Sequence, residues 1–254
     1  MKRVPILLLP VLLLALLAAC QASPAEGDHT APLPGAAQMT CRVVAVLDGQ
    51  AILAQAEGRA SDVYALPLEG VPVTYAGPEQ TALRPGDLVQ VGYGGTIQET
   101  FPAQLGEVAA IQVQAQGFDD LCALYLQVLT DLWDTDTALN EGIVQLGLDL
   151  SQTRLSPAEQ HALGVALSRQ RDLPVRQATW EELTQDGTID AENLQWKDGL
   201  FLSIQEEDPA AADLTFTAQK WRGGLAAYSF VDCTARQGAD GAWSSYTPGA
   251  HAVS

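Results

Sequence analysis

The chain has 254 residues, with 13 Lys and Arg against 31 Asp and Glu, so its formal net charge at pH 7 is −18. Nucleic acids are bound mainly by cations that neutralise phosphates, so this charge excludes DNA and RNA as expected partners. It also opposes adsorption to anionic lipid through a basic surface. Hydrophobic residues make up 47% of the chain, which is enough for two modest cores.

The first twenty residues have the order of a bacterial lipoprotein signal. Two cations at positions 2 and 3 precede an apolar run over residues 4–17, and the sequence Leu17-Ala18-Ala19-Cys20 follows. As a helix, this run extends about 21 Å, short of the ~30 Å hydrocarbon core and unsuited to a permanent span. We therefore expect cleavage between Ala19 and Cys20 and a diacylglyceryl group on Cys20, which anchors an extracytoplasmic protein to the cell membrane. An ordinary secretory signal and an uncleaved anchor are the alternatives.

Composition divides the chain into four segments. Residues 1–19 are the expected signal peptide, and residues 20–38 are the lipidated cysteine and a flexible spacer rich in Ala, Pro, Gly and Ser. Residues 39–116 contain short β-branched runs broken by turn residues, whereas residues 117–254 contain the clearest helical patterns. We expect an OB-like β-barrel domain followed by an α+β domain.

The OB-like prediction rests on the number of short strands within the first region, roughly five or six. Asp48-Gly49 separates two apolar runs and predicts a tight hairpin. Arg84-Pro85-Gly86-Asp87 and Gly94-Gly95 predict further turns. The runs that read as strands are residues 42–47, 51–54, 63–68, 71–75, 88–93 and 108–113.

The second region begins with helices and ends with strands. Asp119 and Asp120 can cap a helix whose apolar residues recur at steps of three and four: Leu121, Leu124, Tyr125, Val128, Leu129 and Leu132. Ser156-Pro157-Ala158-Glu159 and Thr179-Trp180-Glu181-Glu182 are capping boxes that start two more helices. Residues 143–148 are predicted to form a strand, with a continuation of the helix as the alternative. A strand at 200–205 and a C-terminal antiparallel sheet from the runs 214–218, 226–234 and 242–246 are expected, in an order similar to NTF2-like or cystatin-like folds.

Four cysteines leave three thiols once Cys20 is assigned to lipid. An extracytoplasmic location permits disulfides, but Cys41, Cys122 and Cys233 cannot all pair within one chain. The candidate bridge joins Cys122 to Cys233, which both lie in the second region. The alternative is three small buried hydrophobic side chains.

No pattern of catalytic or metal-ligating residues stands out in the sequence. Asp131, Asp134 and Asp136 lack the spacing and central glycine of a calcium loop, so we expect a solvated acidic face there. Three histidines and the lack of a G-x-S-x-G elbow leave no evident zinc site or serine triad. We therefore expect no catalytic residues, no metal and no cofactor.

Aromatic residues are concentrated in the last third of the chain, and they supply a candidate ligand-binding set: Trp196, Trp221, Arg222, Tyr228 and Trp243. Flat aromatic faces can line a groove for a glycan or a peptide because they bury a large area at low entropic cost. The guanidinium of Arg222 is suited to an anionic group. The alternative interpretation is the ordinary core of a small sheet.

Several motifs together resemble lipoproteins of Gram-positive gut bacteria that have no assigned activity. These motifs are the signal ending at Cys20, Gly86-Asp87-Leu88-Val89 with Glu99-Thr100-Phe101-Pro102-Ala103, and Gln219-Lys220-Trp221-Arg222 with Asp232-Cys233-Thr234-Ala235. The resemblance covers most of the chain after the signal. It implies a type of protein, and it transfers no catalytic or binding residues.

Three functional hypotheses follow from these patterns. The first is a non-catalytic surface lipoprotein on the outer face of the cytoplasmic membrane that binds a small molecule, a glycan or a protein. The second is an envelope hydrolase, which requires two carboxylates buried in one cleft with displaced pKa values. The third is an assembly or sensor subunit that docks beside other envelope proteins.

Overall fold

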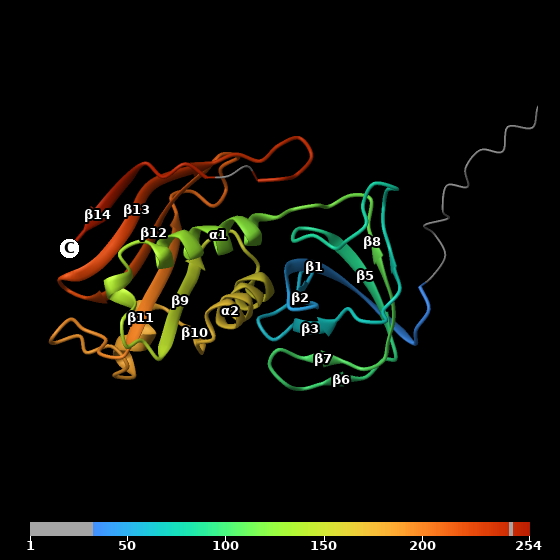
Figure 1. Cartoon of the computed structure of the whole chain (residues 1–254), viewed down its shortest axis with the longest axis horizontal. Helices are drawn as coiled ribbons and strands as arrows, with labels where there is room; N and C mark the ends of the chain where they lie inside the picture. Colours follow the sequence, from blue (N-terminus) through green and yellow to red (C-terminus); the bar gives the residue numbers. More distant parts are fainter. Residues whose placement is uncertain (1–32, 244–245) are drawn as a thin grey trace, which may run out of the picture. The chain divides into compact units, whose positions relative to one another are not determined.

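The computed structural model describes residues 33–243 and 246–254, and all structural statements below concern those residues (Figure 1). The expected signal peptide, the cleavage site at Ala19, the lipidation site at Cys20 and most of the spacer lie outside them. Leu33–Ser254 forms one compact unit. It contains two six-stranded sheets, one two-stranded ladder and three α-helices, so the α+β class is confirmed.

The first six-stranded sheet has the strand order β3-β2-β1-β5-β8-β4. Asp48 and Gly49, with φ of 50° and 73°, join β1 to β2 as the predicted tight hairpin. Gly86, with φ of 95°, lies in the predicted turn before β5. The strands of this sheet are β1 (Ala37–Leu47), β2 (Gln50–Gln55), β3 (Val63–Pro67), β4 (Val73–Thr74), β5 (Leu88–Tyr93) and β8 (Val108–Val113).

The first sheet does not close into a barrel, because β3 and β4 remain as its two edges. One face of this sheet packs against a separate hydrophobic core, which includes Cys41, Val43, Leu53, Tyr64, Val89, Val91, Ile111 and Val113. The chain between β5 and β8 forms a separate ladder from β6 (Ile97–Gln98) and β7 (Gln104–Leu105). The predicted OB-like barrel is therefore not confirmed, since the spacing of strands along the chain does not determine whether edge strands pair.

The first helix, α1 (Leu121–Asp134), buries all six apolar residues predicted for its inner face. Its start differs in detail from the prediction. Asp119 accepts a hydrogen bond from the Leu121 amide at 3.0 Å, whereas the carboxylate of Asp120 accepts from the amide of Trp243 at 2.7 Å. Asp120 therefore connects α1 to a distant loop and makes no side-chain cap of its own.

Both predicted capping boxes form. Ser156 and Glu159 exchange side-chain and backbone hydrogen bonds at the start of α2 (Pro157–Arg171), and Thr179 and Glu182 do the same for α3 (Trp180–Gln185). A short 3-10 helix, η1 (Thr137–Asn140), follows α1.

The second six-stranded sheet has the order β10-β9-β11-β12-β13-β14 and is mixed. The pairs β11–β12, β12–β13 and β13–β14 are antiparallel, as expected for the C-terminal part of the chain, whereas β9 pairs in parallel with β10 and β11, which was not predicted. The reason is that α2 and α3 return the chain across the sheet between these strands. The parallel strands are β9 (Gln145–Gln152), β10 (Val175–Gln177) and β11 (Gly199–Glu206), and the antiparallel ones are β12 (Leu214–Gly223), β13 (Ala226–Ala235) and β14 (Ala250–Val253).

The strand predicted at residues 242–246 does not form in its described part. Trp243 makes only an isolated bridge with Gln237, and the edge strand is β14, which the sequence analysis did not predict.

The helix α2 packs against both six-stranded sheets, contacting β1, β2 and β3 of the first and β9 and β10 of the second. Its central residues 162–167 are all buried, because apolar partners lie on both sides of it. One apolar cluster consequently includes Val44 and Ile52 from the first sheet and Leu148 and Leu202 from the second. The domain boundary proposed at residue 116 stays a prediction.

Candidate functional site

The aromatic residues of the candidate ligand-binding set are separated into two buried clusters. Trp196 and Trp221 pack with Trp180 and Phe201, and the rings of Trp180 and Trp221 meet edge to face at 4.4 Å. Trp243 packs in the main core instead, with Tyr228 at its margin. The structure therefore does not gather these side chains into one groove.

The polar groups of the same set are engaged within the chain. The guanidinium of Arg222 donates to the carbonyls of Leu139, Glu141 and Lys197, at 3.2, 2.6 and 2.9 Å. The hydroxyl of Tyr228 lies 2.7 Å from Nδ1 of His251. Arg222 thus joins two segments, the end of η1 and the loop at Lys197, through their backbone oxygens. This arrangement explains its position without an anionic ligand.

A buried ion pair crosses the core of the second sheet. Glu206 is 4% exposed, and its carboxylate accepts from Nε of Arg154 at 2.7 Å, from the Arg154 amide at 2.8 Å and from the Tyr125 hydroxyl at 2.7 Å. The Arg154 guanidinium also lies over the ring of Trp243, 5.7 Å from its centroid. Burial, followed by the hydrogen bond to Glu206, raises the pKa of Tyr125. Every group of this cluster therefore has a partner on the protein.

The ammonium of Lys220 is fully buried at the C-terminal end of α1. It donates to the carbonyls of Trp133 at 3.3 Å, Thr135, and Asp136 at 3.0 Å, and it lies 3.4 Å from Oδ1 of Asn140. These carbonyls include acceptors that the end of a helix leaves unsatisfied, and the helix dipole favours a cation there. Burial lowers the pKa of Lys220 to about 8, although Asp136 acts in the opposite direction.

The sequence contains a pattern that indicates the burial of Lys220 and Glu206. Lys220 continues the inward alternation of Leu214, Phe216 and Ala218 along β12, and Glu206 continues that of Leu200, Leu202 and Ile204 along β11. A charged residue at the next inward position of such a pattern predicts a buried ionic group. Neither residue was identified as buried from the sequence.

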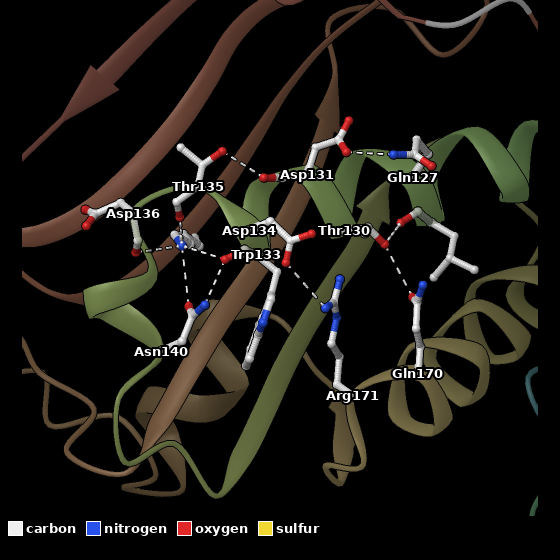
Figure 2. Close-up of polar contacts among 12 residues, drawn as sticks. Gln127, Thr130, Asp131, Trp133, Asp134, Thr135, Asp136, Asn140, Gln170 and Arg171 are labelled. Atoms are coloured by element: carbon white, nitrogen blue, oxygen red, sulfur yellow. Dashed lines mark hydrogen bonds and ion pairs between the residues drawn. The ribbon is translucent and has the colours of Figure 1, made fainter.

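The three aspartates near the end of α1 make contacts within the protein (Figure 2). Asp131 accepts from Gln127 at 2.6 Å and from the Tyr246 hydroxyl at 2.8 Å, and Asp134 lies 3.6 Å from the guanidinium of Arg171. The part of the chain that the structure describes contains no group of three or more metal-ligating side chains. The acidic face is therefore partly neutralised by its neighbours.

The three cysteines of the described chain are buried free thiols. Cys122 lies on α1 and Cys233 on β13, and the candidate disulfide between them is not formed in the structure, in keeping with the alternative of buried thiols. Burial raises the pKa of Cys41 to about 12 and that of Cys233 to about 11, and it raises the pKa of Cys122 as well. These thiols have the properties of small core side chains.

One face of the second sheet carries mostly polar side chains, and we call it the polar face. The helices α1 and α2 pack on the opposite face, where the inward residues of β9, β11, β12 and β13 form the main core. The polar face consists of Asp149, Ser203, Gln205, Thr215, Thr217, Gln219, Ser229 and Thr234. All of these side chains except Ser229 are partly or fully exposed.

Strand register aligns the polar face into rows. Asp149, Ser203, Gln219 and Ser229 lie opposite one another on four adjacent strands, and the Gln219 amide donates to the Ser229 hydroxyl at 3.2 Å. The neighbouring row on one side is the buried cluster of Phe201, Trp221 and Ala227 beneath α3. At the other end, Thr215 and Thr234 border a hollow of about 350 Å³, which is also lined by Asp213, Arg236 and Thr247.

No protein-family model, curated protein or solved structure matches the chain. Among the described residues, no helix is both long enough and apolar enough to cross a membrane.

Proposed function

We propose that this chain is a non-catalytic, lipid-anchored surface protein whose polar face binds a neutral, hydroxyl-rich ligand, namely a glycan. The anchoring part of the proposal is supported by the Leu17-Ala18-Ala19-Cys20 sequence after a short apolar run. The compact unit begins at Leu33, so a spacer of ordinary tether composition separates it from Cys20.

The observation that carries the binding proposal is the row Asp149, Ser203, Gln219 and Ser229 on the polar face. Hydroxyl and amide groups both donate and accept hydrogen bonds, so such a row can match the hydroxyls of a sugar chain. The cores of protein interfaces are instead rich in aromatic side chains, and the aromatic side chains near this row are buried. The OB-like arrangement of the first sheet remains part of the proposal, as a second contact or a spacer.

The non-catalytic part is supported by the positions of the buried acids. Among the described residues, Asp87 and Glu206 are the carboxylates below 5% exposure. Asp87 lies in the turn before β5, and Glu206 lies at the end of β11 in the second sheet. Asp87 accepts from the Arg84 amide and from Gln80, and Glu206 is paired with Arg154. Asp87 lines a hollow together with Asp240, but Asp240 is exposed. Within the part of the chain that the structure describes, neither buried carboxylate therefore has a second buried carboxylate in the same cleft, which a hydrolase of the kind considered above requires.

Lipidation is tested by replacing Cys20 with Ser in cells fed a labelled fatty acid. The wild-type protein should carry the label and partition into membranes, and Cys20→Ser should do neither. Labelling of the variant equal to that of the wild type would contradict the anchor.

Glycan binding is tested by screening the full chain in detergent against an array of neutral oligosaccharides. Gln219→Ala and Ser203→Ala should each weaken the binding that is found, by about tenfold if a hydrogen bond is lost. Thr40→Ala, on an exposed position of the first sheet, is the matched control and should bind as the wild type does. Exclusive selection of charged polymers, or equal binding by all variants, would reject the polar face as the site.

A further inference from the structure

The strand β14 forms one edge of the second sheet, and its backbone geometry can be derived from its pairing with β13 (Figure 1). Ala227 and Ser254 exchange two backbone hydrogen bonds, at 3.1 and 3.2 Å. In an antiparallel pair such residues alternate with residues that do not bond to each other. Ala252 opposite Ser229, and Ala250 opposite Val231, are therefore the next bonded positions.

It follows that the amide and carbonyl groups of His251 and Val253 point away from β13, toward the free side of β14. No described strand pairs with that side. The four residues of β14 are all exposed, and none is Asp, Glu, Lys, Arg or Pro. Edge strands usually carry charges or prolines that prevent another strand from pairing with them, and β14 has neither.

The side chains next to this edge indicate what kind of strand fits. His251 and Val253 lie on the same side of the sheet as Tyr228 and Phe230, and the ring centroids of Phe230 and His251 are 5.1 Å apart. Val253 is 70% exposed, so it offers apolar contact to a neighbouring side chain. Because the chain carries a net charge of −18, a positively charged partner is attracted and a second copy of the chain is repelled.

We propose that β14 is a docking site for an extended peptide segment of another protein, with Lys or Arg alternating with apolar residues. The segment adds a seventh strand to the second sheet, bonds to the backbone of His251 and Val253, and places an apolar side chain beside Val253. This site is separate from the polar face, so it goes beyond the glycan proposal and does not depend on it.

The test measures binding of an acetylated and amidated hexapeptide of alternating Lys and Val to the full chain in detergent. The control peptide has the same sequence and charge, with N-methyl groups on the valine amides, which face β14 when a valine lies beside Val253. The first peptide should bind at least about tenfold more tightly than the second, because a backbone hydrogen bond to the edge is lost. The proposal is overturned if both peptides bind equally well, or if neither peptide binds.

Two variants locate the site. Val253→Pro removes the outward amide at position 253 and keeps the inward amides of Ala252 and Ser254, so peptide binding should fall by about tenfold while the melting temperature is retained. The control variant is Val253→Ala, which keeps the amide at position 253. It should bind the peptide more tightly than Val253→Pro. Unchanged binding by Val253→Pro rejects the edge. A dimer of the wild-type chain that Val253→Pro abolishes assigns the edge to a second copy and also rejects the proposal.

Discussion

Tyr125 and Glu206 are 81 positions apart in the sequence, yet the Tyr125 hydroxyl donates to Oε1 of Glu206 at 2.7 Å inside the core. This hydrogen bond joins α1 to β11, and Arg154 completes the neutralisation of the same carboxylate. Removing one member of a buried ionic group leaves the others without a partner, which costs more than the loss of an exposed pair.

We therefore expect Glu206→Ala to lower the free energy of unfolding by about 3–5 kcal/mol, and Tyr125→Phe by about 1.5–3 kcal/mol. The control is Asp213→Ala, which removes the exposed ion pair with Arg236 and should change stability by less than about 1 kcal/mol. Urea unfolding followed by tryptophan fluorescence measures all three. Equal losses for Glu206→Ala and Asp213→Ala would show that the buried cluster has no special role.

From the lowered pKa of Lys220, we predict that its contribution to stability rises with pH. Burial lowers its pKa in the folded protein to about 8, below the ordinary value of 10.5. Between these values the unfolded chain binds more protons than the folded chain, so the contribution of Lys220 to the free energy of unfolding rises with pH across this window. The measurement is the difference in unfolding free energy between wild type and Lys220→Met at pH 7.5–10.5.

That difference should become more favourable to the wild type as pH increases. Comparing the two proteins at each pH cancels the titration of tyrosines and cysteines, which both share. A difference that stays constant, or that declines with pH, would contradict the lowered pKa.

Because the three thiols are buried, we expect the folded protein to resist alkylation. Cys41, Cys122 and Cys233 should not react with iodoacetamide at pH 8 in the folded protein, because they are buried and their pKa values are raised. In urea without reductant, all three should react. Two thiols that become reactive only after reduction would reveal the Cys122–Cys233 disulfide instead.

The capping box of α2 gives a prediction for local stability. Ser156→Ala removes the side-chain acceptor for the Glu159 amide, and should destabilise the protein by about 1 kcal/mol. Ser151→Ala, at an exposed end of β9, is a control of the same chemistry and should cost less than about 0.5 kcal/mol. Chemical unfolding checks both variants, and equal effects would mean that the cap contributes little.

The features that the sequence predicted well depend on residues close together in the chain. The Asp48-Gly49 hairpin, the two capping boxes and the inner face of α1 each follow from backbone preferences or periodicity within a few residues. The parallel pairing of β9 with β10 and β11 was missed, because it depends on where α2 and α3 cross the sheet.

The candidate site was predictable only in part. Trp196, Trp221 and Trp243 were identified as notable residues, but their separation into two cores depends on strand register. The polar face follows from alternation along β11 and β12, where outward Ser, Thr and Gln accompany inward Leu, Ile and Phe. Only the observed register shows that these outward residues form rows.

The position of α2 has a consequence for engineering this protein. Since the helix supplies apolar cover to strands of both sheets, a fragment ending before it would leave Val44, Ile52 and their neighbours in water. Such a fragment should aggregate, and a graft of either half onto another scaffold would have to carry α2 with it or redesign the surface that α2 protects.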